Sequence, residues 1–99
     1  MSDFAGIIGF DWDGGNARKN EKHGVSAAEA EQVFFNSPLL VLEDAKHSSK
    51  ESRYHALCKT NEGRLLHVTF TLRQAGSNIR VISARNMHRK GREIHEKAT

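Results

Sequence analysis

The side chains of this sequence that could perform chemistry are imidazoles, guanidinium groups and a few carboxylates. Histidine and glutamate can exchange protons when their pKa is tuned towards neutral pH, and histidine needs little tuning. Arginine stays charged and presents a fork that matches the oxygens of a phosphate. The candidates for proton transfer are His23, Glu51, His55 and His67, and the candidates for binding an anion are Arg53, Arg64, Arg80 and Arg85.

These groups suit the cleavage of an RNA phosphodiester without a metal ion. A base removes the 2′-hydroxyl proton, cations stabilise the charge at phosphorus, and an acid protonates the departing 5′ oxygen. Tyr54 could stack on a base, as aromatic side chains often do with single-stranded RNA. We therefore expect a catalytic set of His23, Glu51, Arg53, Arg80 and Arg85, and an RNA-binding set of Lys22, Tyr54, His55, Arg64 and His67.

Structural alternatives stay open for the histidines. His23 precedes Gly24, so it could simply neutralise the carbonyl groups at a helix end. His55 and His67 could be half-exposed strand residues with no contact to a ligand. Sequence alone does not choose between these roles.

The other candidates have similar alternatives. Arg53 and Glu51 lie two positions apart and could form a surface ion pair of little energetic value. Tyr54 could belong to the core. The basic run from His88 to Arg92 could be a solvated helix face or a contact with a polyanion or a partner.

Length and composition limit the class of protein. The chain has 99 residues, the size of one small domain, and its net charge of +3 suits a polyanion or an acidic protein as partner, although a merely soluble basic protein fits too. The single cysteine, Cys58, excludes an internal disulfide and is expected in the core or sheet. No signal peptide or membrane-spanning run is evident, so we expect a cytoplasmic protein.

Cofactor motifs are missing from the sequence. His47, His55 and His67 lack the tight spacing of metal ligands, and no phosphate-binding or dinucleotide-binding glycine pattern occurs. We therefore expect neither a metal nor a cofactor.

The elements that must position these groups follow from periodicity. Residues 26–29 read Ser-Ala-Ala-Glu, a capping box that predicts a helix ending before Pro38. A weaker helix is expected from about residue 13 to His23, and residues 4–12 form an extended arm or short strand. Alternation predicts strands at residues 39–43, 53–59, 64–73 and 79–84. A basic helix is expected at residues 87–97, at the end of the chain.

This order predicts an α+β fold. Two N-terminal helices should pack on a roughly four-stranded antiparallel sheet, with a further helix at the C-terminus. We expect the helices to cover the face with Leu66, Val68 and Phe70. The opposite face, with Arg53, His55 and His67, should meet solvent or a ligand.

Several motifs, in order, resemble the BrnT family of toxins. Residues 10–13 (Phe-Asp-Trp-Asp) and 20–26 (Asn-Glu-Lys-His-Gly-Val-Ser) match its N-terminal half, together with Glu29-Ala30 and Val33-Phe34. The second half matches at residues 51–54 (Glu-Ser-Arg-Tyr), 63–66, 69–71 and 79–85 (Ile-Arg-Val-Ile-Ser-Ala-Arg). The resemblance spans residues 10–92 of a single domain, 1–99, in which residues 1–9 form an arm or edge strand.

The resemblance implies a RelE-like fold and a metal-independent endoribonuclease that arrests translation. It implies a type II toxin–antitoxin system in which a ribbon-helix-helix antitoxin of the BrnA kind neutralises the toxin in a hetero-oligomer. Operator DNA would be bound only through that complex.

Two departures from the family pattern leave alternatives open. Gly14-Gly15 weakens the first helix, and Gly91-Arg92 with His95 replaces the usual residues of the last helix. A toxin-like module that only binds its antitoxin and contributes to operon repression is therefore the alternative. A third possibility is an unrelated basic regulator that binds nucleic acid without a partner.

Overall fold

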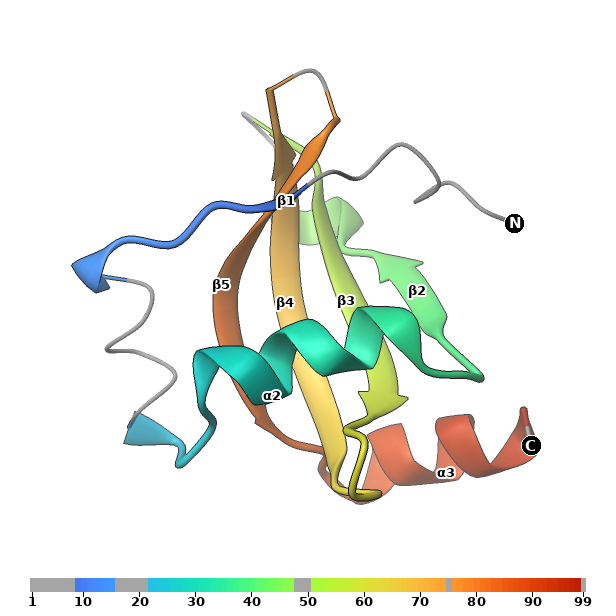
Figure 1. The fold of residues 1–99 in the computed structure, drawn as a ribbon. Coiled ribbons are helices and arrows are strands. Elements are labelled where there is room, and N and C mark those ends of the chain that lie inside the picture. The colour runs from blue at the N-terminus through green and yellow to red at the C-terminus, as the bar shows by residue number, and fades with distance from the viewer. Residues whose placement is uncertain (1–8, 16–21, 48–50, 75, 99) are drawn as a thin grey trace.

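The computed structural model describes residues 9–15, 22–47, 51–74 and 76–98. They form one five-stranded sheet in the order β1-β5-β4-β3-β2 (Figure 1). The strands are β1 (Gly9–Phe10), β2 (Leu40–Glu43), β3 (Arg53–Lys59), β4 (Leu65–Arg73) and β5 (Asn78–Asn86). The helical elements are α2 (Ala27–Gln32), the 3-10 turns η1 (Val33–Phe35) and η2 (Ala45–His47), and α3 (Arg89–Lys97).

The sheet is mixed, and this corrects the sequence prediction. Strands β2 to β5 are antiparallel neighbours, as expected, but β1 adds a fifth strand that runs parallel to β5. Phe10 lies opposite Ile79, and the Asp11 amide donates to the Ile79 carbonyl at 2.8 Å. The arm therefore satisfies backbone groups at the edge of β5, a tertiary pairing that no local pattern in two residues can announce.

The prediction of two N-terminal helices on an antiparallel sheet is also wrong. The complete α-helices within the described ranges are α2, in the middle of the chain, and α3, at its end, and residues 14, 15 and 22 are also helical. Most of the helix expected from residue 13 to His23 falls on 16–21, outside the described residues. The class is still α+β, but a single helix, α2, crosses the core face of the sheet (Figure 1).

Helix α2 begins where the capping box predicted. The Ser26 hydroxyl accepts from the Glu29 amide at 3.1 Å, and the Glu29 carboxylate accepts from the Ser26 amide at 3.1 Å. Before it, Gly24 has a φ of +70°, the left-handed conformation expected of a glycine after a helix. The chain then tightens into η1, so that Ala30 and Val33 are fully buried against the sheet.

The core lies between α2 and one face of the sheet. Alternation along β4 places Leu66, Val68 and Phe70 there, all with 0% exposure. The Phe70 ring meets Phe34 edge-on, with centroids 5.0 Å apart, and stacks on Tyr54 at 5.4 Å. Cys58 is buried in the same cluster, as expected, and burial raises the pKa of its thiol.

Helix α3 covers only one end of the other face. Its Gly91 approaches Leu57, and an added Cβ there would lie 3.5 Å from Leu57 Cδ2. His95 is buried beneath the helix, with Nε2 3.1 Å from the Pro38 carbonyl oxygen. The rest of this face, which we call the open face, carries the polar residues of β3, β4 and β5.

Candidate active site on the open face

Strand register arranges the open face in three rows across β3, β4 and β5. His55 lies opposite Thr69, which lies opposite Ser83. On one side of this row is Leu57–His67–Arg85, and on the other is Arg53–Thr71–Arg80. Residues directly opposite each other share a face of the sheet, so the rows bring histidines and arginines from three strands to one side.

A β-bulge in β5 makes this possible. Arg80 and Arg85 are five positions apart, and strict alternation would send them to opposite faces. The register shifts between Thr69 and Phe70, because Thr69 pairs with Ser83 whereas Phe70 pairs with Val81. Ile82 is therefore an extra residue, and both arginines lie on the open face.

The row nearest α3 opens into a cavity of about 250 Å³, which we call the main hollow. Its walls combine apolar side chains with cationic and imidazole groups from the sheet and from α3. The lining residues are Leu42, His55, Leu57, His67, Arg85, His88, Lys90, Gly91 and Ile94. Such a mixture can hold an organic group on its apolar part and an anion at its charged rim.

A second cavity, the side hollow, adjoins the first. It measures about 300 Å³ and is lined by His23, Arg85, Asn86 and His88. Arg85 and His88 line both cavities, so they stand at the junction between them. His23 therefore reaches this region from the chain segment before α2, far from β5 in sequence.

His67 and His55 are in direct contact inside the main hollow. Nε2 of His67 lies 2.9 Å from Nδ1 of His55, and the rings meet edge-on with centroids 4.8 Å apart. Burial lowers the pKa of His67 to about 4, and the nearby charges of His55, Arg85 and His88 act in the same direction. His67 is therefore neutral at physiological pH and able to accept a proton.

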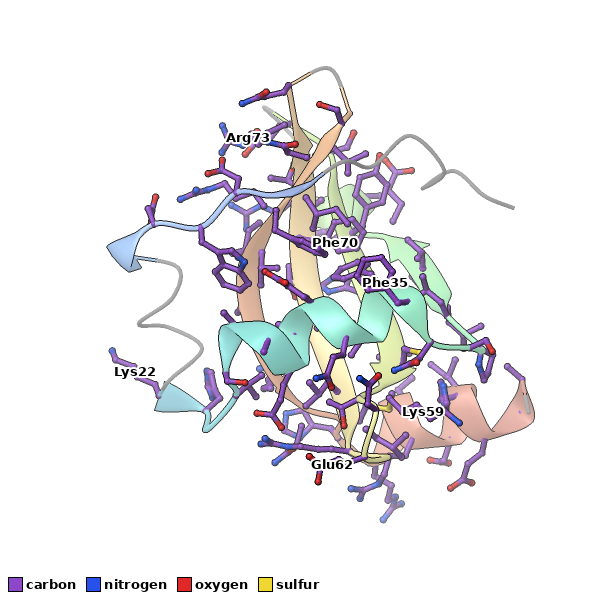
Figure 2. All side chains as sticks on the ribbon, viewed as in Figure 1. Lys22, Phe35, Lys59, Glu62, Phe70 and Arg73 are labelled. Carbon is purple, nitrogen blue, oxygen red and sulfur yellow. The ribbon has the colours of Figure 1, made fainter. Side chains whose placement is uncertain are left out.

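Two of the predicted catalytic residues are engaged elsewhere. Glu51 forms an ion pair with Arg73 at 3.2 Å, and Arg73 lies at the opposite end of the sheet from Lys59 and Glu62 (Figure 2). Arg80 shares the open face but binds Asp13 at 2.7 Å and Asp11 at 3.4 Å. Two carboxylates already offset its charge, which disfavours a phosphate there.

Arg53 shares a row with Arg80 and is half-buried. Arg53 is two residues from His55 along β3, which corresponds to about 7 Å at the usual rise of a strand. The structure thus places it on the open face but beyond the residues that line either hollow.

Three of the predicted RNA-binding residues also lie apart from the hollows. The Arg64 guanidinium donates to the Gly24 carbonyl at 2.9 Å, to Glu29 at 3.0 Å and to Asn86 at 2.8 Å. Tyr54 is on the core face against Phe70. Lys22 is exposed on the segment leading to α2 (Figure 2).

Sequence reasoning missed Asp44. This carboxylate follows β2, and its Oδ2 lies 3.0 Å from Nε2 of His55. Only the pairing of β2 with β3 brings the two together, so the local sequence holds no signal for it. His88 and Lys90, which line the main hollow, belong to the basic run noted in the sequence, but the sequence did not predict where in the fold they lie.

Two features are absent from the described part of the chain. No group of three or more His, Cys, Asp or Glu side chains there could hold a metal ion. No helix in the same residues is long and apolar enough to cross a membrane.

Fold and site together define a small α+β domain with a cationic, imidazole-lined surface. The family model described as "Ribonuclease toxin, BrnT, of type II toxin-antitoxin system" matches residues 12–91. The chain therefore belongs to the BrnT family of ribonuclease toxins, which act with a protein antitoxin. No curated protein matches the chain.

Proposed function

We propose that this chain is a metal-independent endoribonuclease whose active site is the pair of hollows joined at Arg85. The observation that carries the proposal is the position of Arg85, which lines both cavities together with imidazole side chains. A guanidinium fork at that junction can hold the scissile phosphate while proton-transferring groups stand on either side.

The reaction that suits this arrangement is transesterification by the 2′-hydroxyl. The 2′ oxygen loses its proton to a base and bonds to phosphorus, while the bond from phosphorus to the 5′ oxygen breaks. The products are a 2′,3′-cyclic phosphate and a 5′-hydroxyl. Arg85 would stabilise the charge on the five-coordinate phosphorus, and the His23 imidazolium in the side hollow would protonate the departing oxygen.

The proposed partners follow from the same surface. A cognate antitoxin of the ribbon-helix-helix kind would neutralise the toxin in a hetero-oligomer by covering the hollows, and acidic side chains would complement their charge. Operator DNA would be bound only through that complex. Cleavage of cellular RNA would arrest translation, which places the activity in the cytoplasm.

The test is expression of the chain alone, in cells and as purified protein. We expect wild-type chain to stop growth and to cut RNA in the presence of EDTA, and co-expression of the adjacent reading frame to restore growth. Arg85→Ala and His23→Ala should each lower the cleavage rate by about 100-fold, the scale of one general acid or electrostatic group.

The contrary outcome is equally specific. Purified chain that binds its antitoxin but leaves RNA intact, with Arg85→Ala indistinguishable from wild type in cells, would identify a module that only binds and represses. Loss of cleavage on adding EDTA, restored by a divalent cation, would overturn metal independence alone.

A further inference from the structure

Three side chains form a continuous hydrogen-bonded line beside the main hollow. Oδ2 of Asp44 lies 3.0 Å from Nε2 of His55, and Nδ1 of His55 lies 2.9 Å from Nε2 of His67. The Thr69 hydroxyl lies 3.0 Å from the same Nδ1. Asp44 and His55 keep only 15% and 28% of their side-chain surface exposed, so solvent competes weakly for these contacts.

While His55 is neutral, the Asp44 carboxylate sets the direction of the protons along this line. An ionised carboxylate only accepts hydrogen bonds, so Nε2 of His55 carries the proton that it donates to Asp44. In neutral His55, Nδ1 is then an acceptor, and Nε2–H of His67 donates to it. The proton-free nitrogen of His67 is therefore Nδ1, which has no hydrogen-bond partner among the described residues.

That nitrogen belongs to a side chain that lines the hollow beside Arg85. The charged and titratable groups around His67 come from each element packed on it: His55 from β3, Asp44 from the end of β2, Arg85 from β5, and His88 and Lys90 from the start of α3. A phosphate bound at Arg85 would thus bring a ribose close to His67.

We infer that His67 is the general base of the cleavage reaction and that Asp44 and His55 are its positioning residues. This inference rests on the proposed function and specifies its chemistry. Nδ1 of His67 takes the 2′-hydroxyl proton, and the freed 2′ oxygen attacks phosphorus. Nε2–H of His67 passes to Nδ1 of His55, so the positive charge rests on His55 beside the Asp44 carboxylate.

The proton shift solves an energetic problem of this site. A positive charge kept on His67 would lie in a partly buried position near Arg85 and His88, and both repel it. The same charge on His55 faces a carboxylate at 3.0 Å. The relay therefore lets an imidazole that is neutral at rest act as an effective base.

The experiment measures kcat/KM against pH for RNA cleavage by the full chain, with RNA binding measured in parallel. His67→Ala should lose about 100-fold or more in kcat/KM. Asp44→Asn keeps an oxygen that can accept from His55 but removes the negative charge. It should lower kcat by about 10-fold at unchanged RNA affinity and shift the acid limb of the pH profile to lower pH.

Glu43→Gln is the matched control, because it removes an exposed carboxylate one residue before Asp44. It should leave both the rate and the pH profile unchanged. Thermal unfolding of each variant reports whether the domain is intact; if His67→Ala does not fold, the pH profile of Asp44→Asn decides.

The outcomes separate this inference from the function on which it rests. If the wild-type chain cleaves RNA and His67→Ala keeps full activity, the relay is overturned but the ribonuclease function is not. The same conclusion follows if the acid limb of the pH profile does not move in Asp44→Asn. A wild-type chain that cuts no RNA would overturn both. Retained cleavage of a substrate with a 2′-deoxy sugar at the scissile position would also overturn the relay, because there would be no 2′ proton to remove.

Discussion

Arg64 connects three segments through one guanidinium group. It reaches the Gly24 carbonyl before α2, the Glu29 carboxylate within α2 and the Asn86 side chain at the end of β5. These contacts hold the start of α2 against the sheet and, with it, the segment that carries His23. The sequence suggested an RNA contact for Arg64, whereas its partners indicate a structural role.

Replacing Arg64 by Ala should therefore lower the free energy of unfolding by about 1–3 kcal/mol, since hydrogen bonds to charged groups are lost and their partners are left unpaired. Urea unfolding measures this. Arg73→Ala is the control, because the Arg73–Glu51 pair is 43% and 40% exposed and should matter by less than about 0.5 kcal/mol. Equal effects for the two variants would contradict a structural role for Arg64.

His67 should make the stability of the domain depend on pH. The pKa of His67 is about 4 in the folded protein, against 6.5 for a histidine in the unfolded chain, chiefly because burial disfavours the charged form. As pH falls through this window the unfolded state binds more protons, so stability decreases. This loss of stability is absent above pH 6.5 and complete below about pH 4.

We therefore expect the Tm of wild-type protein to drop between pH 6.5 and 4 more steeply than the Tm of His67→Val. Calorimetry of both proteins at matched salt gives the comparison. The other groups around the site, namely Asp44, His55, Arg85, His88 and Lys90, are present in both proteins, so the difference between the curves belongs to His67. Parallel curves would refute the assignment.

At the scale of elements, α3 is the wall that turns an open sheet face into a hollow. Gly91 lies in its first half, where glycine costs about 1 kcal/mol relative to alanine. An added Cβ would meet Leu57 Cδ2 at 3.5 Å and Met87 atoms at 3.7 Å, ordinary contact distances. Neither space nor backbone conformation therefore requires a glycine at position 91, unlike the positions where a glycine is held at positive φ.

Gly91→Ala should raise the free energy of unfolding by about 1 kcal/mol, which for a domain of this size is a rise in Tm of about 4–8 °C. Gly63→Ala is the counterpart, because Gly63 has open space but a φ of +89°, and it should lower Tm. A lower Tm for Gly91→Ala would mean that α3 packs on Leu57 more tightly than these distances indicate.

The elements that could be predicted from the sequence are those that are determined by residues close together in the chain. The capping box at Ser26 and the alternation of β3 and β4 are local, so α2 and these strands were predicted closely. The parallel pairing of Phe10 with Ile79 and the contact of Asp44 with His55 depend on segments far apart in sequence. The parallel pairing of the N-terminal strand with β5 and the contacts that link Asp44, His55 and His67 therefore became visible only in the folded chain.

The whole molecule carries a net charge of +3, but its distribution matters more than the total. Arg64, Arg73 and Arg80 are each paired with carboxylates. Arg85, His88 and Lys90 line the main hollow instead, where a polyanion can approach them. RNA binding should therefore be focused at the hollows rather than spread over the surface.

The salt dependence of RNA binding tests this focus. Each phosphate neutralised on a single strand contributes about 0.7 to the slope of log K against log salt concentration. Arg85→Ala should reduce the slope by about that amount and weaken binding to all sequences, whereas Arg73→Ala should leave it unchanged. Fluorescence anisotropy over a salt series measures both, and equal slopes for the two variants would count against a focused site.

The extra residue in β5 makes this strand sensitive to the loss of a single residue. With Ile82 present, Val81 faces the core while Arg85, four residues on, faces the opposite side of the sheet. Removing one residue there would restore simple alternation and force either a guanidinium into the apolar interior or Val81 into water. A deletion of a single codon at this position would thus be far more damaging than most substitutions around it, because it would turn half of a strand inside out.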